Sequence, residues 1–158
     1  MSPKAQHQES SLARPVSITA VVDPVGALAA RSLQGHLYLY DTNKAGGSTG
    51  FGTEGLHTRV GKDDQVLWNV VVLECETYAS IDGIEIDDRI CEPERQVYPG
   101  TDIVYWTATV KRDLTEPAPY RLSFRLGTLT EPITTTSSPF LVGQTNGTRP
   151  PTPVKERG

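Results

Sequence analysis

The segment YRLSFRL, residues 120–126, alternates apolar and polar side chains along its whole length. Apolar residues occupy every second position from Tyr120 to Leu126, and Arg121 and Arg125 lie between them. Successive side chains of a β-strand point to opposite faces, so this period of two predicts a strand with one apolar and one charged face. The fold is therefore expected to be built from strands around a core.

The same period recurs in other parts of the chain. Residues 104–110 alternate in the same way, and their second face carries Tyr and Thr, which favour strands. Residues 66–73, VLWNVVVL, are apolar on both faces, which predicts a central strand covered from two sides. Weaker strands are expected at residues 18–22, 36–40, 56–60, 81–86 and 133–142. About eight strands predict an all-β fold, an antiparallel β-sandwich.

Turns are expected to be frequent and helices few, because the chain contains 14 Gly and 12 Pro. One short helix is expected at residues 25–32, after the start signal formed by Asp23 and Pro24. The glycine-rich residues 46–53 have no following Lys and open no helix. They therefore predict a wide turn rather than a phosphate-binding loop.

The chain divides into one domain and two tails. Residues 16–143 hold the apolar runs, whereas residues 1–15 and 144–158 are rich in Ser, Pro, Gln, Thr and charge, and we expect these tails to be disordered. Residues 1–15 contain no apolar signal segment, and no run approaches the roughly 18 apolar residues of a membrane helix. We expect a soluble cytoplasmic protein without a membrane partner.

Charge is distributed unevenly along the chain, whose net charge is −4. The tails are basic, and carboxylates concentrate between Glu74 and Glu94, so nucleic acid is not expected as a partner. Within this acidic segment Asp82, Asp87 and Asp88 would be the ligands of a Ca²⁺ ion, which binds oxygen. The alternative is a solvated acidic surface, because no Asp-x-Asp-x-Asp-Gly loop is present. No other cofactor is expected.

Two cysteines, Cys75 and Cys91, are too few for a zinc site without neighbouring histidines. A hairpin between them would permit a disulfide. A pair of buried thiols is the favoured alternative, because the chain shows no export signal.

Acid–base chemistry has only weak candidates. Glu74 with Glu85 would form a carboxylate pair if their strands were neighbours, and His36 with His57 would need a shared cleft. No nucleophile motif such as Gly-x-Ser-x-Gly accompanies them, so we expect surface carboxylates and imidazoles and assign no catalytic residue.

Aromatic side chains offer a different chemistry. Tyr38 and Tyr40 alternate with Leu37 and Leu39, so their rings are expected on the face opposite the core, and Tyr105 is a further candidate. Such rings stack against sugars and aromatic ligands. Trp68 and Trp106 are expected in the core.

Several segments, taken in order, resemble the bacterial inclusion-body protein family represented by PixA and AidA. They are residues 18–23 (ITAVVD), 36–40 (HLYLY), 50–56 (GFGTEGL), 60–68 (VGKDDQVLW), 120–126 (YRLSFRL) and 138–142 (SPFLV). The chain departs from the family after Trp68, where residues 70–73 are apolar, and at residues 132–136, PITTT. The resemblance implies a cytoplasmic β-sandwich without an established catalytic site, whose relatives accumulate in inclusions or are induced by cell-density signalling.

Three functions follow as hypotheses. The first, which we favour, is a non-catalytic β-sandwich that forms a homo-oligomer and acts through self-association or accumulation, with open edge strands as one route. The second is a lectin-like module that binds a carbohydrate or small molecule through Tyr38, Tyr40 and Tyr105, with or without Ca²⁺. The third is a small β-fold enzyme of specialised metabolism, with Glu74 or His57 as acid or base.

Overall fold

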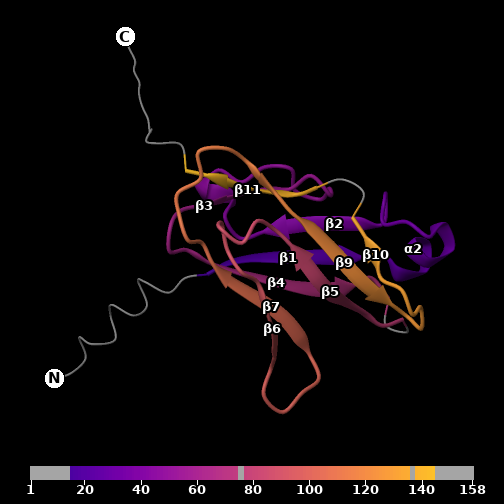
Figure 1. Ribbon diagram of the computed structural model, residues 1–158. Helices are drawn as coiled ribbons and strands as arrows, with labels where there is room; N and C mark the ends of the chain where they lie inside the picture. Colours follow the sequence, from indigo (N-terminus) through magenta and orange to yellow (C-terminus); the bar gives the residue numbers. More distant parts are fainter. Residues whose placement is uncertain (1–14, 75–76, 136–137, 145–158) are drawn as a thin grey trace, which may run out of the picture.

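The structure, a computed structural model, describes residues 15–74, 77–135 and 138–144. Two layers of strands face each other across one core (Figure 1). One layer is a five-stranded sheet in the order β2-β1-β4-β7-β6, and the other holds two three-stranded sheets, β10-β9-β5 and β3-β11-β8. The all-β sandwich expected from the alternating segments is confirmed.

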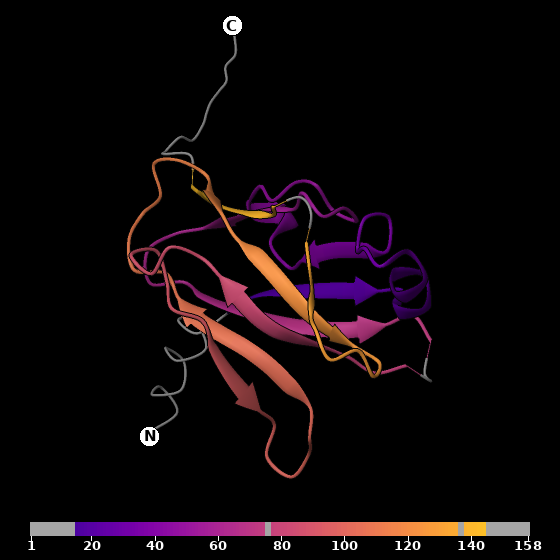
Figure 2. The same ribbon diagram turned by 45° about the vertical axis from the view of Figure 1, so that its right-hand side comes forward.

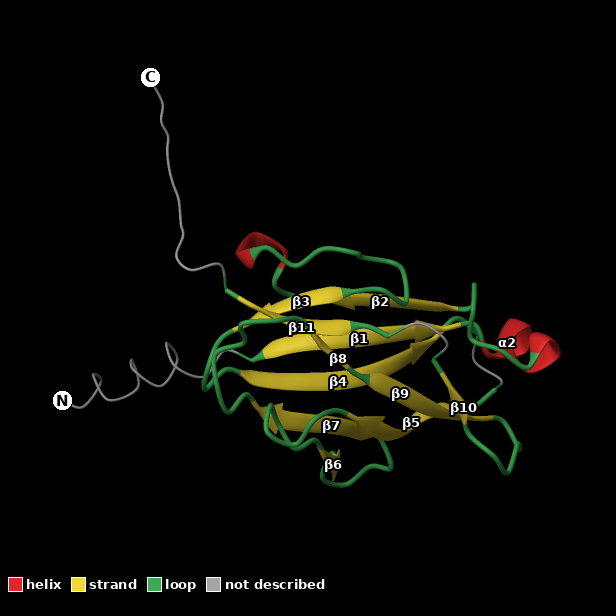
Figure 3. Cartoon of the chain, turned by 45° about the horizontal axis from the view of Figure 1, so that its top comes forward, coloured by secondary structure: helices red, strands yellow, loops and turns green. Residues whose placement is uncertain are grey.

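The strands of the five-stranded sheet are β1 (Val16–Val22), β2 (Leu37–Asp41), β4 (Gln65–Val72), β6 (Glu94–Val97) and β7 (Val104–Thr109). Those of the second layer are β3 (His57–Val60), β5 (Ala79–Glu85), β8 (Ala118–Pro119), β9 (Arg121–Leu126), β10 (Ile133–Thr134) and β11 (Phe140–Gly143). Figure 3 shows how the strands of the second layer cross the inner face of the larger sheet.

The strands and their pairing differ from the expected ones at several points. The segment expected at 133–142 is two strands, β10 and β11, and β6 and β8 were not expected. His36 lies just before β2 rather than within it. Two neighbouring pairs, β1 with β4 and β3 with β11, are parallel, although the other pairs are antiparallel as expected. Alternation assigns side chains to faces but does not say which strands are neighbours.

The core lies between the layers and is centred on β4. Trp68 is fully buried, and its indole N–H donates to the hydroxyl of Tyr120 at 3.3 Å. The two rings meet edge to face, with centroids 5.7 Å apart, a favourable aromatic geometry. The parallel register sets Ile18 of β1 beside Trp68, so strands far apart in sequence meet at this ring.

The expected helix is present as α2 (Pro24–Ala30), between β1 and β2. Asp23 caps it by accepting a hydrogen bond from the amide of Gly26, and Pro24 stands at its first position, where proline is tolerated. A Cβ on Gly26 would collide with the ring of His36, so a larger residue here would displace that ring. A 3₁₀ turn, η1 (Lys44–Gly46), follows β2.

Cys91 is a free thiol in the core, as expected for a buried cysteine, and burial raises its pKa to about 11. Cys75 lies outside the described residues, as do residues 1–14 and 145–158 of the expected tails. The division into domain and tails stays a prediction. In the described ranges, we find no helix with the length and apolar character needed to cross a lipid bilayer.

Candidate binding face of the five-stranded sheet

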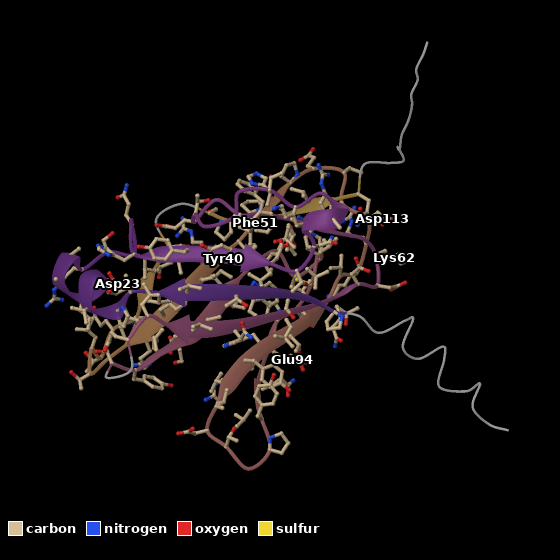
Figure 4. The ribbon with its side chains drawn as sticks, turned by 180° about the vertical axis from the view of Figure 1, so that it is seen from behind. Asp23, Tyr40, Phe51, Lys62, Glu94 and Asp113 are labelled. Carbon is tan, nitrogen blue, oxygen red and sulfur yellow. The ribbon has the colours of Figure 1, made fainter. Side chains whose placement is uncertain are left out.

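The outer face of the five-stranded sheet is the surface turned away from the second layer. Figure 4 views the molecule from this side, with β2, β1, β4 and β7 toward the viewer, and no described element covers these strands. The residues that project from it share one parity along each strand: Ser17, Thr19, Val21, Tyr38, Tyr40, Gln65, Leu67, Asn69, Val71, Glu94, Gln96, Tyr105, Thr107 and Thr109.

The register places these side chains in rows across the strands. Tyr40 of β2 lies opposite Thr19 of β1, and Thr19 lies beside Asn69 of β4. In the next row Val21 lies between Tyr38 and Val71. These two rows therefore begin with a tyrosine at the β2 edge, and one continues with polar side chains and the other with aliphatic ones.

The β6–β7 hairpin extends the outer face beyond the second layer (Figure 2). Tyr105 lies opposite Gln96, and its ring packs on that of Tyr98 with centroids 4.3 Å apart. Ile103, which receives the amide hydrogen bond of Tyr98, is exposed at the same end. The hairpin thus adds a second aromatic and apolar group to the face.

Two tyrosines of β2 are held in place by the loops beside them. The hydroxyl of Tyr38 donates to the carbonyl of Gly35 at 3.0 Å. The ring of Tyr40 lies against Gly52, where an added Cβ would stand 3.3 Å from its hydroxyl oxygen. Gly52 also has a φ of +80°, a conformation that glycine adopts without strain. A hydrogen bond therefore orients the ring of Tyr38, and the ring of Tyr40 lies beside a residue without a side chain.

The outer face carries little charge. Among the projecting residues of the described strands, Glu94 is the one charged side chain (Figure 4). By contrast, the outward side of β5 and β9 presents charged pairs: Glu85 opposite Arg121, and Arg125 bonded to Asp82 at 2.9 Å. The neutral outer face is therefore chemically distinct from the other exposed sheet.

The expectation that the apolar strand at 66–73 is covered from two sides is wrong for the described chain. The strand is central, between β1 and β7, as expected. Val66 and Trp68 are buried on its inner side, but Val71 and Leu73 are exposed. Its outward apolar residues are thus not needed for the core that the structure describes.

The three predicted ligand residues Tyr38, Tyr40 and Tyr105 share the outer face. Three strand spacings, about 14 Å, separate the β2 tyrosines from Tyr105 on β7. Asn69 lies between them, and its side-chain oxygen is buried without a hydrogen-bond partner in the described residues. Tyr98 was not predicted, because it follows the short edge strand β6, which has no apolar alternation.

The predicted calcium ligands do not gather into one site. The carboxylate of Asp82 is bonded to Arg125, and that of Asp87 to Arg89 at 2.8 Å. The hydrogen bonds from Arg89 lower the pKa of Asp87 to about 2. Among the residues that the structure describes, no three His, Cys, Asp or Glu side chains form a group suited to a metal ion. The contacts of Asp82 and Asp87 therefore give the prediction of a calcium site with Asp88 no support.

The acid–base pairs are also apart. Glu85 ends β5, about 20 Å along the strand from Ala79, whereas Glu74 lies in the connection before that strand. His36 lies next to Asp23 beside α2, and His57 begins β3, toward the other end of the sandwich (Figure 1). Neither pair forms a shared site.

A family model described as "Domain of unknown function (DUF8788)" matches residues 14–131. The chain belongs to this DUF8788 family. No curated protein matches the chain. Among solved structures it is similar to the inclusion body protein PixA from Burkholderia cenocepacia J2315, with a TM-score of 0.59 and 16% sequence identity over 82% of this chain and 91% of that chain. The DUF8788 chain thus has a PixA-like fold, in agreement with the resemblance seen in its sequence.

Proposed function

We propose that this DUF8788 protein is a non-catalytic protein that associates with copies of itself through the outer face of the five-stranded sheet. The observation that carries the proposal is the exposure of large apolar side chains on that face. Tyr40, Val71, Tyr98 and Ile103 are exposed to 45%, 49%, 42% and 56%. These four side chains lie on one face of the sheet, and large apolar side chains that gather on an exposed face mark interaction sites.

Charge favours a second copy as the occupant. The chain is acidic, so two copies repel each other wherever their carboxylates meet. The outer face projects Glu94 near one end and otherwise neutral side chains, so it is a surface on which like charges do not oppose association. The similarity to a protein named for inclusion bodies is consistent with this function.

Sedimentation velocity over a range of concentrations tests the proposal. We expect the mass of the wild-type protein to rise with concentration and the Val71→Lys variant to stay monomeric, because association would bury the lysine charge in the interface. Tyr78→Lys is the matched control, since Tyr78 is 56% exposed but precedes β5 in the other layer. A monomeric wild-type protein, or equal association of all three proteins, would overturn the proposal.

Carbohydrate binding is a second candidate, favoured by the arrangement of Tyr38, Tyr40 and Tyr105 on one neutral face. Sugars present C–H groups to aromatic rings and hydroxyls to side chains such as Thr19, Asn69 and Gln96. Thermal unfolding with mono- and oligosaccharides tests this function, and Ca²⁺ and EDTA arms test a metal. A ligand at about 100 times its Kd should raise the free energy of unfolding by roughly 2.7 kcal/mol, which raises the Tm by several degrees. Tyr40→Ala should abolish this shift, and Tyr78→Ala should retain it. A panel without shifts would reject it.

A further inference from the structure

A groove in the second layer, remote from the outer face, is lined by two opposite charges that form no ion pair with any described residue. On one side of the groove are the paired parallel strands β3 and β11, and on the other side is the loop of residues 114–117. Its volume is about 420 Å³. This lies within the roughly 300–1,000 Å³ of small-molecule sites. Arg59, His57 and Glu116 line it, together with the hydroxyls of Thr49 and Thr115.

Arg59 supplies a positioned cation. Its side chain donates from Nε to the carbonyl of Gly47 and from Nη1 to the carbonyl of Gly143, which fixes the plane of the guanidinium. No ion pair of Arg59 occurs among the described residues. Its remaining N–H groups are therefore available to a carboxylate, for which the guanidinium fork is well suited.

His57 supplies an oriented ring beside Arg59. Its Nδ1 lies 2.8 Å from the carbonyl oxygen of Gly55, and a carbonyl only accepts, so Nδ1 carries the proton. The ring also stacks on Phe140, with centroids 4.7 Å apart and an interplanar angle of 24°. In the neutral ring Nε2 is therefore left as an acceptor whose direction is fixed.

Glu116 supplies the opposite charge from the loop that closes the groove. It is exposed and forms no ion pair or hydrogen bond in the part of the chain that is described. The loop can lie against β11 because Gly143 has no side chain, and a Cβ there would collide with the carbonyl oxygen of Leu114. Arg59 and Glu116 thus line the same groove without pairing with each other.

We propose that this groove binds a small amino-acid-like zwitterion. The ligand carboxylate lies on Arg59, the ammonium group lies toward Glu116, and a ligand N–H donates to Nε2 of His57. An anion alone would meet the carboxylate of Glu116, and a cation alone would meet Arg59, so a ligand with both charges complements the groove better than either.

Titrations followed by ¹H–¹⁵N NMR test this site with four probes at neutral pH: glycine, γ-aminobutyrate, acetate and methylammonium. We expect saturable shifts at the amides of Gly47, Arg59 and Glu116 with at least one zwitterion, and weaker binding of acetate and methylammonium. The two zwitterions differ in the distance between their charges. The one that binds more tightly therefore indicates the distance between the charges of Arg59 and Glu116.

Glu116→Gln is the decisive variant, because Glu116 is exposed and its loss leaves the fold intact. We expect it to weaken zwitterion binding about tenfold, the effect of one charge-assisted hydrogen bond, and to leave acetate binding equal or stronger. Arg59→Gln should abolish binding of both, and Arg121→Gln, an exposed arginine on β9, should change neither. The proposal is overturned if no probe gives saturable shifts, or if acetate binds as tightly as both zwitterions and Glu116→Gln changes nothing.

Discussion

The two faces of the five-stranded sheet are built from the same strands, but one face is buried and the other is exposed. On the inner face Ile18, Leu39 and Trp68 are fully buried beneath the second layer. On the outer face Tyr40 and Val71 are exposed, and no described element covers them. Both faces nevertheless carry apolar side chains, so hydrophobicity alone does not tell the core from the surface in this sheet.

The difference between the faces separates the residues that stabilise the fold from those that are available for binding. The inner face specifies the sandwich, because its side chains pack against strands that are distant in sequence. The apolar residues of the outer face contribute little to that packing and are available to a partner. If this division is right, substitutions on the two faces must separate stability from association.

The largest loss of stability is expected from Trp68→Ala on the inner face. The change removes a fully buried ring and leaves a cavity, and large aromatic-to-alanine changes cost about 3–5 kcal/mol. The hydroxyl of Tyr120 also loses its indole donor. Urea unfolding measures the change, and a loss below about 1 kcal/mol would mean that the ring is not the centre of the core.

Alkaline pH probes the inner core through Cys91, whose pKa burial raises to about 11. In the unfolded chain the thiol titrates near its ordinary value of about 8.5. Between these values the folded protein binds more protons than the unfolded chain, so the free energy of unfolding falls as pH rises, by at most about 3 kcal/mol. The Cys91→Ala variant should lose less stability over this interval, because it lacks the thiol. Some loss remains in both proteins, because the pKa values of Tyr120 and Lys111 are also raised. Equal losses would contradict burial of the thiol.

Val66 and Val71 form a matched pair on opposite faces of β4. Val66 is buried and Val71 is half exposed. Val66→Ala should cost about 2 kcal/mol, the transfer and cavity terms of two methyl groups, whereas Val71→Ala should cost less than about 0.5 kcal/mol in the monomer. Chemical denaturation of dilute protein gives both values, and equal costs would mean that the outer face is covered.

Asn69→Val on the outer face of β4 should have an effect of the opposite sign, a small gain in stability. The side-chain oxygen of Asn69 is buried without a partner in the described residues, and valine favours a strand. Removing the unsatisfied group should stabilise the protein by about 1 kcal/mol. Thermal and urea unfolding both report the gain, and a loss of stability would show that the amide has a partner.

The strands that pack the core could be predicted from the sequence, because burial on one face imposes a period of two. Residues 120–126 and 104–110 follow that period and correspond to β9 and β7. The edge strand β6 could not be predicted, since its residues Glu94–Val97 are largely solvated and carry no apolar alternation. Parallel pairing of β1 with β4 depends on contacts across the sheet, which a local pattern does not contain.

The candidate face was partly predictable for the same reason. Tyr38 and Tyr40 alternate with buried leucines, so their outward direction follows from the sequence. That they share a face with Tyr105, three strands away, required the strand order. The groove at Arg59 and Glu116 was not predicted at all, because it joins β3, β11 and a loop that are far apart in the chain.

Hydroxyl-radical footprinting of the wild-type protein at low and high concentration tests the central claim most directly. It reports the solvent exposure of Tyr40, Tyr98 and Tyr78 in one sample, and all three are exposed in the single chain. Our account predicts that a higher protein concentration protects Tyr40 and Tyr98 on the outer face from oxidation, while Tyr78 stays reactive. Unchanged reactivity of Tyr40 and Tyr98, or protection of Tyr78 to the same degree, would contradict the outer face as the surface of self-association.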